Sequence, residues 1–389
     1  MHDYDACILG AGASGLFCAL TAARLGQTVA VVDHNAACGR KLRLTGGGRC
    51  NFGNVSVDAS HYFCANANFC LSALARFPAQ AFGDFLRDNG LDTNQEPGGK
   101  LFCRQGAGPV TDLLERLCRD SGVKFHLNTR IKDVDSAQGF RVKLLGREIL
   151  TRKLVVATGG LAWPQVGATC FGYGLAEKFG LKVLEPRPAL VPLNMGPDWA
   201  YSALAGVSLL VTVQAGQTVF TDHMLFTHQG LSGPAILQLS GSLAPGQALR
   251  LDLLPGQDIR EILAATRPGK TLTKTVLARL LPARLAASLL PRELGEKPVA
   301  QLRAEETAFL AGRLSNWEIT PLKTGGYAKA EVTAGGVDTR ELSSKTMECQ
   351  KVPGLYFVGE VQDVTGQLGG YNLHWAWASG QACGQAIGS

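Results

Sequence analysis

Apolar residues in the first 33 positions form two short runs with a helical pattern between them. Residues 6–9 and 29–32 are entirely apolar, and Gly26 ends the intervening helical pattern. That pattern consists of Leu16, Ala19, Leu20 and Ala23. Short, wholly apolar runs are typical of parallel strands that are covered on both faces. The pattern therefore predicts a strand, a helix and a second, parallel strand.

A glycine-rich turn joins the first predicted strand to the helix. It has the Gly-x-Gly-x-x-Gly pattern, Gly10-Ala11-Gly12-Ala13-Ser14-Gly15, and Asp33 follows the second strand. Gly10 allows a tight turn, Gly12 lets a pyrophosphate approach the helix N-terminus, and Gly15 allows close packing. An acid at Asp33 suits a ribose and disfavours a 2′-phosphate, which predicts FAD or NAD. The alternative, a glycine-rich turn without a ligand, leaves Asp33 unexplained.

A second glycine cluster follows directly after the second strand. Gly46, Gly47 and Gly48 are consecutive, and cations flank them. These cations are Arg40, Lys41, Arg43 and Arg49. Such a loop can wrap a phosphate-rich ligand, and an NAD dehydrogenase does not need it, so FAD is favoured. The alternative is a flexible basic surface loop.

Three later segments are expected to return to the same site. Residues 154–157 form an apolar run before Thr158-Gly159-Gly160, and residues 355–358 form another before Gly359. The last predicted helix, 375–385, follows Gly369-Gly370-Tyr371-Asn372. The positive end of that helix would stabilise a reduced, anionic flavin.

The chain resembles the bacterial BaiN/RdsA-like FAD-dependent oxidoreductases, also called YhiN-like or aminoacetone-oxidase-like flavoproteins. The strings that carry the resemblance run nearly end to end: Gly10–Gly15, Gly39–Lys41, Gly46–Asn51, Ala157–Gly160, Leu225–Pro234, Ala330–Val337, Thr346–Glu348 and Gly354–Gly380. Two positions depart from it, since many relatives have Pro instead of Cys103 and Gln instead of His374. The resemblance implies an α/β fold: a Rossmann-like, glutathione-reductase-like FAD-binding domain with inserted β-barrel-like and small helical domains.

The predicted domain boundaries follow from changes of pattern after Pro186-Arg187-Pro188. Short strand-like runs fill residues 190–255, and helical patterns interrupted by prolines fill residues 256–313. We expect a split FAD-binding domain at 1–189 and 325–389. The β-rich insert would comprise 190–255 plus about 314–324, and the helical insert 256–313.

The residues expected to contact FAD come from all of these segments. They are Gly10, Gly12, Ala13, Ser14, Gly15, Asp33, Arg40, Lys41, Gly47, Gly48, Arg49, Cys50, Asn51, Ile131, Thr158, Gly159, Gly160, Gly359, Glu360, Asp363, Gly369, Gly370, Tyr371 and Asn372. In glutathione-reductase-like flavoproteins, the segment at Ile131 touches the adenine. Asp363 is expected near the ribityl chain, and Tyr371 and Asn372 at the isoalloxazine ring.

The cysteines, the histidines and the lengths of the apolar runs narrow the class of protein further. The eleven cysteines include no Cys-x-x-Cys pair, and the seven histidines lack metal-ligand spacing, so we expect no metal. The odd cysteine count, the absence of a leader and the absence of a long apolar run predict a cytoplasmic protein without a membrane span.

The formal net charge of +6 is concentrated in the helical insert. Its cations are Arg260, Arg267, Lys270, Lys274, Arg279, Arg284 and Arg292, and Glu261 is the one acid between Arg260 and Arg292. Either this is a solvated helix face, or it docks a polyanion such as ribosomal RNA. No aromatic residue lies between Arg260 and Arg292, which argues against base stacking there.

The expected reaction is reduction of a C=C bond. No second dinucleotide fingerprint is present, so NAD(P)H would dock only transiently as the reductant. The candidate proton donors are Cys50, His228, Tyr371 and His374. Arg49 would favour a Cys50 thiolate. Structural roles are the alternatives: Cys50 as a small buried residue, His228 as a hydrogen-bonding group, and His374 as a capping or packing residue.

The resemblance implies two substrate precedents, steroid enones and a uridine of 23S ribosomal RNA that becomes dihydrouridine. The basic insert favours the RNA. Two rival hypotheses remain, an oxidase of small amines and a non-catalytic flavoprotein that binds ribosomal RNA during assembly.

Overall fold

The computed structural model describes residues 2–244 and 246–389, and the chain divides into two compact units. Unit 1 comprises Met1–Arg187 and Val332–Ser389, and unit 2 comprises Pro188–Glu331. Each unit has its own hydrophobic core. The chain leaves unit 1 along strand β11 (Val183–Ala189) and returns along β19 (Val332–Val337), and these two strands pair.

A five-stranded parallel sheet forms the centre of unit 1. Its strands are β1 (Tyr4–Leu9), β2 (Val29–Val32), β7 (Lys124–His126), β10 (Glu148–Val156) and β20 (Leu355–Phe357). They lie in the order β7-β2-β1-β10-β20. In chain order this is 3-2-1-4-5, the order of doubly wound dinucleotide-binding folds. The predicted strands over the apolar runs are therefore confirmed.

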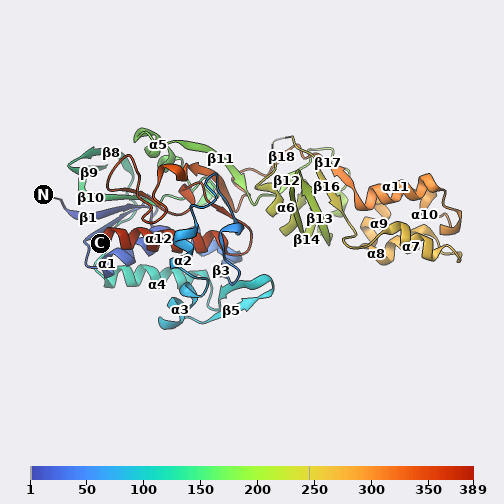
Figure 1. Ribbon diagram of the computed structural model, residues 1–389, viewed down its shortest axis with the longest axis horizontal. Coiled ribbons are helices and arrows are strands. Elements are labelled where there is room, and N and C mark those ends of the chain that lie inside the picture. The colour runs from blue at the N-terminus through green and yellow to red at the C-terminus, as the bar shows by residue number, and fades with distance from the viewer. Residues whose placement is uncertain (1, 245) are drawn as a thin grey trace. The chain divides into compact units, whose positions relative to one another are not determined.

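Three helices lie side by side along one face of this sheet: α1 (Ala13–Arg24), α4 (Ala107–Asp120) and α12 (Tyr371–Gly388) (Figure 1). Glycines let α1 and α12 approach closely. A Cβ atom at Gly380 would lie 2.7 Å from the Ser14 carbonyl oxygen, and one at Gly384 would lie 2.6 Å from the Cβ of Thr21. The helix predicted over 375–385 is longer than expected, because Gly370, with a φ of +99°, caps it at Tyr371.

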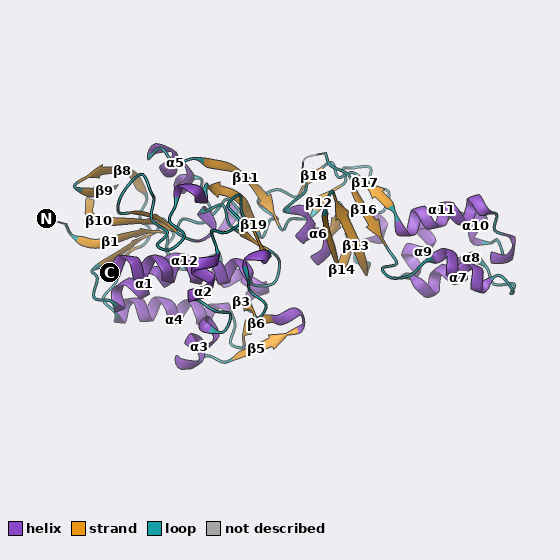
Figure 2. Cartoon of the chain, in the orientation of Figure 1, coloured by secondary structure: helices purple, strands orange, loops and turns teal. Residues whose placement is uncertain are grey.

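Smaller elements surround this core (Figure 2). β8 (Ile131–Ala137) and β9 (Gly139–Leu144) continue antiparallel from the first half of β10. A second sheet contains β3 (Asn51–Asn54), β6 (Lys100–Cys103) and β5 (Thr93–Glu96). The others are β4 (Tyr62–Phe63) paired with β21 (Thr365–Gly366), α2 (Leu71–Arg76), α3 (Ala81–Asp88) and α5 (Phe171–Lys178).

Unit 2 combines a seven-stranded sheet with a group of short helices. The sheet order is β17-β16-β13-β14-β15-β12-β18. These strands are β12 (Leu193–Asn194), β13 (Ser208–Ala215), β14 (Thr218–Thr227), β15 (Gly230–Ser232), β16 (Leu249–Asp252), β17 (Trp317–Ile319) and β18 (Lys323–Thr324). α6 (Pro234–Ser240) packs on this sheet.

The helices of unit 2 follow the predicted proline breaks. They are α7 (Ile259–Thr266), α8 (Thr273–Leu280), α9 (Ala283–Leu289), α10 (Arg292–Gly295) and α11 (Ala304–Ser315). Pro282 and Pro291 are the N-caps of α9 and α10, where a fixed φ starts a helix without breaking a backbone hydrogen bond. Together the two units confirm the predicted α/β fold class.

Candidate functional site

The glycine-rich turn between β1 and α1 has three glycines in three different environments. Gly10 has a φ of +112°, and a Cβ there would overlap the Ala157 carbonyl oxygen. A Cβ at Gly15 would overlap the Gly10 carbonyl oxygen. Gly12, the N-cap of α1, has no atom within 4 Å of the position of a Cβ. The turn therefore leaves open space only at Gly12, where the free N–H groups of a helix N-terminus attract an anion.

Asp33 lies at the end of β2, next to this turn. Its Oδ2 accepts a hydrogen bond of 2.7 Å from the Ala11 N–H, and its Oδ1 accepts one of 2.7 Å from the Asn35 N–H. The Thr129 N–H donates to the Asp33 carbonyl at 2.9 Å, which brings the segment before Ile131 alongside. The Asn35 amide also donates to Oδ1 at 3.0 Å, so Asp33 is fixed at the turn and its Oδ2 keeps one lone pair for a further donor.

The triple-glycine loop has three successive left-handed residues, with φ values of +58°, +67° and +85° at Gly46, Gly47 and Gly48. Nothing lies within 4 Å of a Cβ at Gly47 or Gly48. The Arg49 guanidinium is paired with Glu96 at 2.9 Å and lies 4.4 Å from the centre of the Phe102 ring. The loop therefore exposes backbone at Gly47 and Gly48, while Arg49 is held by Glu96 and Phe102 and its Nε donates to the Gly46 carbonyl at 3.4 Å.

Lys41, Glu360 and Thr333 form a connected network that joins three segments. The Lys41 Nζ lies 2.7 Å from the Glu360 Oε2, and the Thr333 N–H donates to the Glu360 Oε1 at 2.9 Å. The Thr333 Oγ1 accepts from the N–H groups of Leu161 and Ala162 at 2.8 and 3.0 Å. Thr333 was not predicted, although it lies in the string Ala330–Val337 on which the resemblance rests.

The ends of β10 and β20 also meet the glycine-rich turn. Gly359 has a φ of +75°, and a Cβ there would overlap the Ser14 side chain. The Gly359 N–H donates to the Ser379 Oγ at 3.0 Å. The Thr158 Oγ1 is buried and has no hydrogen-bond partner among the described residues, and nothing lies within 4 Å of a Cβ at Gly159. A buried hydroxyl without a partner is costly unless a ligand satisfies it.

The N-terminus of α12 lies beside β3. When the Asn51 amide is turned so that its nitrogen faces carbonyl oxygens, its oxygen accepts a hydrogen bond from the Gly370 N–H at 3.1 Å. The Asn54 amide donates to the Gly369 carbonyl at 3.2 Å, and the Asn372 amide closes a loop by bonding both backbone groups of Gly366 at 2.8 Å. Asn372 is therefore committed to backbone groups, and the start of α12 is held rigidly.

Tyr371 lies at this helix start and stacks on His61, with ring centres 4.5 Å apart and planes 9° apart. Burial, with a smaller contribution from Asp58, raises the pKa of the Tyr371 phenol. The His61 Nδ1 lies 3.2 Å from the Asp58 carboxylate. His61 and Asp58 were not predicted, and no pattern in the sequence singles them out.

Asp363 follows β20 and accepts a hydrogen bond from the Ala65 N–H at 2.8 Å. Burial raises the pKa of this carboxyl group, with a smaller contribution from Asp338. This acid is therefore less readily ionised than an exposed aspartate.

Three of the four candidate proton donors, Cys50, His374 and Tyr371, are buried, and Cys50 and His374 are completely so. Burial raises the pKa of the Cys50 thiol to about 12, which corrects the expectation that Arg49 favours a thiolate. The desolvation of the thiol outweighs Arg49 because that guanidinium is held by Glu96. Burial lowers the pKa of His374 to about 4, and its Nε2 lies 3.0 Å from the Phe77 carbonyl oxygen.

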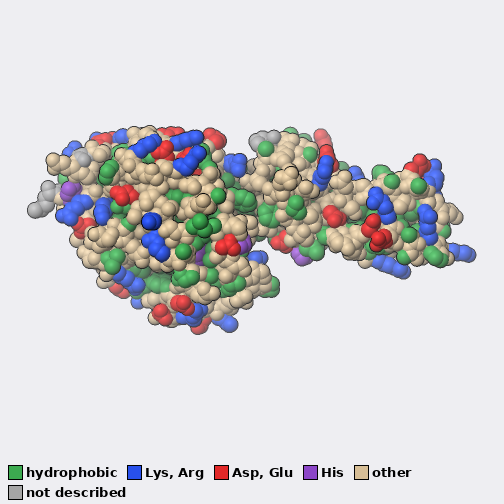
Figure 3. Space-filling view, in the orientation of Figure 1, with side chains coloured by type: hydrophobic (Ala, Val, Ile, Leu, Met, Phe, Trp, Pro, Cys, Tyr) green, Lys and Arg blue, Asp and Glu red, His purple; other side chains and the backbone are tan. Residues whose placement is uncertain are grey.

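The remaining candidates from the sequence lie in unit 2. His228 is exposed in the turn between β14 and β15. All seven cations of the helical insert are exposed. Lys274 pairs with Glu296 at 2.6 Å, and Arg267 and Arg284 donate to backbone carbonyls. On the face drawn in Figure 3, acidic side chains lie among the cations of these helices.

The segments of unit 1 fit a dinucleotide. Hydrogen bonds join the glycine-rich turn to Asp33, and they join Lys41 through Glu360 and Thr333 to the loop after β10. The triple-glycine loop follows Lys41 in the chain. Open space at Gly12, Gly47, Gly48 and Gly159 and the unpartnered Thr158 hydroxyl leave room and polar groups for a ligand.

Among residues 2–244 and 246–389, no group of three or more His, Cys, Asp or Glu side chains could hold a metal ion. Within the same residues, no helix is both long and apolar enough to cross a membrane.

The parallel sheet order and this site define a Rossmann-like, FAD-binding flavoprotein of the oxidoreductase class. The chain belongs to the HI0933-like family, because the model of the HI0933-like protein Rossmann domain matches residues 4–386. This confirms the resemblance inferred from the sequence.

Known relatives match the chain over its whole length. It is 44% identical to a ribosomal RNA dihydrouridine synthase from Escherichia coli strain K12, over 100% of this chain and 98% of the relative. It is 32% identical to a 3-dehydro-bile acid delta(4,6)-reductase from Clostridium scindens, over 97% of this chain and 98% of the relative. The fold is similar to a 3-ketosteroid delta1-dehydrogenase from Sterolibacterium denitrificans, with a TM-score of 0.55, 15% identity and 99% of each chain covered.

Proposed function

We propose that the linked segments of unit 1 hold FAD. In this proposal, the N-terminus of α1 at Gly12 binds the pyrophosphate, Asp33 accepts hydrogen bonds from the adenosine ribose, and residues near Ile131 contact the adenine. The triple-glycine loop and Lys41 lie along the dinucleotide. The start of α12, at Gly370 and Tyr371, lies at the pyrimidine end of the flavin, where the helix dipole favours negative charge. The remaining predicted contacts are assigned to the same site.

We further propose that the reaction is reduction of a uridine C=C bond in 23S ribosomal RNA to dihydrouridine. The observation that carries this proposal is the 44% identity to a ribosomal RNA dihydrouridine synthase over the whole chain. The match extends over unit 2 as well as unit 1, whereas similarity confined to the dinucleotide fold would say nothing of the substrate. An RNA substrate of this kind would place the protein in the cytoplasm.

Tyr371 is the proton donor that the geometry favours. A bound FAD, once reduced by an NAD(P)H that docks transiently, would supply a hydride to one carbon of the C=C bond, and an acid of this chain must protonate the other carbon. Tyr371 belongs to the start of α12, and burial raises its pKa, so it keeps its proton at neutral pH. Cys50 and His374 are completely enclosed by protein atoms, whereas Tyr371 keeps 6% of its surface exposed. His228 stays a candidate from unit 2.

Mass-spectrometric mapping of ribosomal RNA tests the proposed function. Deleting the gene is expected to remove one dihydrouridine from 23S ribosomal RNA, and the wild-type gene is expected to restore it. A Gly12→Val variant, which fills the proposed pyrophosphate space, is expected to fail. An unchanged modification map in the deletion strain contradicts the proposal. If the Gly12→Val variant rescues ribosome assembly without dihydrouridine, the non-catalytic hypothesis is favoured.

A second candidate function is reduction of a small enone. The specific observation in its favour is the 32% identity to a 3-dehydro-bile acid delta(4,6)-reductase. The discriminating experiment mixes the reduced, FAD-loaded protein with a steroid enone or with ribosomal RNA in the absence of oxygen. Flavin reoxidation by RNA alone supports the first candidate, and reoxidation by the steroid alone supports the second.

A further inference from the structure

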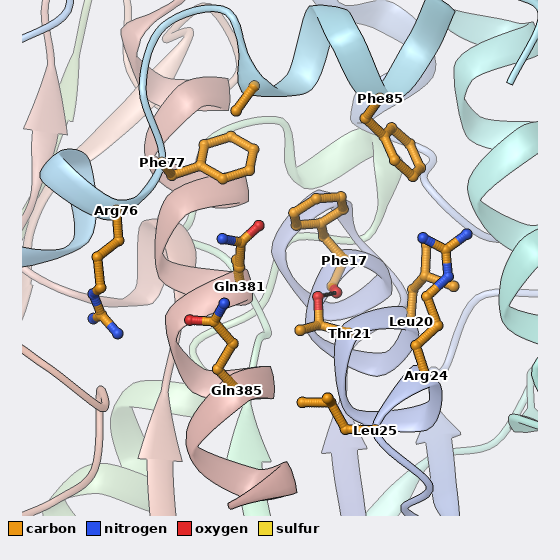
Figure 4. Close-up of a pocket in the computed structure, with 11 residues that line it drawn as sticks. Phe17, Leu20, Thr21, Arg24, Leu25, Arg76, Phe77, Phe85, Gln381 and Gln385 are labelled. Atoms are coloured by element: carbon orange, nitrogen blue, oxygen red, sulfur yellow. Dashed lines mark hydrogen bonds between the residues drawn. The ribbon is translucent and has the colours of Figure 1, made fainter. Parts of the chain in front are cut away.

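A groove lies on unit 1 between the second halves of α1 and α12 and the chain from Arg76 to Phe85 (Figure 4). Its cavity volume is about 350 Å³, at the small end of the range for ligand sites, which begins at about 300 Å³. It is remote from the start of α12, because Gln381 and Gln385 follow Tyr371 by ten or more residues at about 1.5 Å each. None of the groove residues was assigned to the flavin site.

The floor of the groove is apolar and partly aromatic. Phe17, Leu20 and Phe77 are buried, and Phe85 is half-buried. The Phe17 ring makes edge contacts with both Phe77 and Phe85, at centre distances of 5.6 and 5.5 Å. Phe17 and Phe77 are only 5% and 3% exposed, so Phe85 is the ring of these three on which a base can stack, and the edge contact with Phe17 holds it in place.

Two amides line one wall of the groove. Gln381 and Gln385 are one helical turn apart on α12, and Figure 4 shows both side chains on α12 between Arg76 and Phe17. Neither amide has a hydrogen-bond partner among the residues that the structure describes, and an amide offers two donors and one acceptor. Unpartnered amides beside an apolar floor can bind the polar edge of a base.

Two guanidinium groups lie on opposite sides of the groove, Arg76 near α12 and Arg24 near Phe85 (Figure 4). The Arg76 guanidinium donates to the carbonyls of Ser72 and Lys345. Neither arginine has a carboxylate partner within the described parts of the chain, and no acid lines the groove. A ligand with one anionic group would satisfy one side only, whereas a nucleotide within a strand has a phosphate on each side of its base.

We infer that this groove binds one unpaired nucleotide of an RNA strand. The base lies on the aromatic floor, its edge bonds Gln381 and Gln385, and the flanking phosphates meet Arg24 and Arg76. Sequence-specific recognition of RNA relies on such splayed bases, stacked on aromatic rings and bonded along their edges. The inference rests on the proposed RNA substrate and adds a docking site for that strand on unit 1, away from the flavin.

Binding of a short single-stranded oligoribonucleotide to the FAD-loaded protein tests the inference. Arg24→Gln/Arg76→Gln is expected to weaken binding and to lower the slope of log affinity against log salt by about 1.4, because each lost phosphate contact accounts for about 0.7. Arg104→Gln/Arg116→Gln is the matched control, since both side chains are exposed in unit 1 outside the groove. FAD content and melting temperature are expected to be unchanged in both variants.

Photo-cross-linking with 5-iodouridine in the same oligoribonucleotide provides the second measurement. The cross-link is expected on the segment from Arg76 to Phe85, and Gln381→Leu/Gln385→Leu is expected to reduce its yield. Competition by uridine 5′-monophosphate but not by benzoate supports a nucleotide site, and the reverse result overturns it.

Failure of this inference can be told apart from failure of the proposed function. Equal affinity and salt slope for wild type and Arg24→Gln/Arg76→Gln overturn the groove assignment, even if the deletion strain has lost its dihydrouridine. An unchanged modification map overturns the proposed function without any measurement on the groove.

Discussion

At the scale of single residues, His374 has the most constrained environment of the candidate side chains. It is completely buried, its Nε2 lies 3.0 Å from the Phe77 carbonyl, and its Nδ1 has no partner among the described residues. The ring must therefore be neutral and must carry its proton on Nε2, because a carbonyl only accepts. Its role is to tie α12 to the segment after α2.

His374 makes the stability of the protein sensitive to acid. Its pKa is about 4 in the folded state, against an ordinary value of 6.5. The unfolded chain therefore binds one more proton between these values, and stability present above pH 6.5 is lost as the pH falls towards 4. Wild type is expected to lose up to about 1.4 kcal/mol per pH unit more than His374→Gln in this window. Urea unfolding at several pH values measures the difference.

The matched control for this prediction is His223→Gln, which changes an exposed histidine. It is expected to leave the pH dependence of unfolding as in wild type. If His374→Gln also keeps the wild-type dependence, the buried ring does not titrate as described.

The sequence could not reveal this burial. A histidine in an apolar helix is compatible with a flavin contact and with a packed interior, and only the position of Phe77, some 300 residues away in sequence, decides between them. The same reason explains the error at Cys50, where the neighbouring Arg49 was visible but its pairing with Glu96 was not. Local sequence shows which groups are near along the chain, whereas burial depends on distant segments.

At the scale of elements, the turn before α1 separates a glycine needed for packing from one that leaves space for a ligand. Gly15 is needed because the helix and β1 approach each other at the Gly10 carbonyl, whereas Gly12 borders open space. The Gly-x-Gly-x-x-Gly pattern predicted both roles. These roles depend only on local backbone geometry, which a short motif specifies well.

Alanine substitutions are expected to separate the two roles. Gly15→Ala is expected to lower the free energy of unfolding of the apoprotein by about 3 kcal/mol, because the new methyl group overlaps backbone. Gly12→Ala is expected to keep the stability of the apoprotein and to weaken FAD binding. Urea unfolding and the fluorescence of bound FAD measure the two effects.

Gly174→Ala is the control, because it adds a methyl group on the exposed face of α5 with no atom within 4 Å. It is expected to change neither property to a measurable extent, apart from a small gain in helix propensity. Full FAD affinity in Gly12→Ala, or wild-type stability in Gly15→Ala, would contradict the assignment of roles.

The ends of helices and strands were harder to predict from the sequence than their presence. The apolar runs correctly predicted the strands β1, β2 and β20, because buried parallel strands have few polar residues. The start of α12 was missed because its cap is a left-handed glycine and not an apolar position. Thr333 was missed because its partners, Leu161 and Ala162, lie in the loop after β10, some 170 residues earlier in the chain.

At the scale of the whole molecule, charge is distributed unevenly between the helices of unit 2 and the rest. The cations counted from the sequence differ in their availability. Within the described residues, Lys274 is paired with Glu296, and the side chains of Arg267 and Arg284 donate to backbone carbonyls. The other four side chains have no ion pair there: Arg260, Lys270, Arg279 and Arg292. A sequence count therefore overstates the charge that a polyanion would meet.

Three of these four cations, Lys270, Arg279 and Arg292, are expected to contribute to RNA binding through phosphate contacts. Lys270→Gln/Arg279→Gln/Arg292→Gln is expected to lower the salt slope for binding of single-stranded RNA by about 2, at about 0.7 per contact. Lys270→Arg/Arg279→Lys/Arg292→Lys keeps every charge and is expected to keep the slope. Fluorescence anisotropy over a range of salt concentrations measures both. A wild-type slope in the neutralised variant would identify these residues as a solvated face.

The insertion of unit 2 between β11 and β19 has a consequence for synthesis of the chain on the ribosome. The second half of unit 1, including β20 and α12, emerges only after all of Pro188–Glu331 has been made. Until then, β10 lacks one neighbouring strand and α1 lacks the helix that covers it. Unit 2 can complete its own core first, so the nascent chain exposes an unfinished apolar surface and acquires a complete FAD site only near the end of translation.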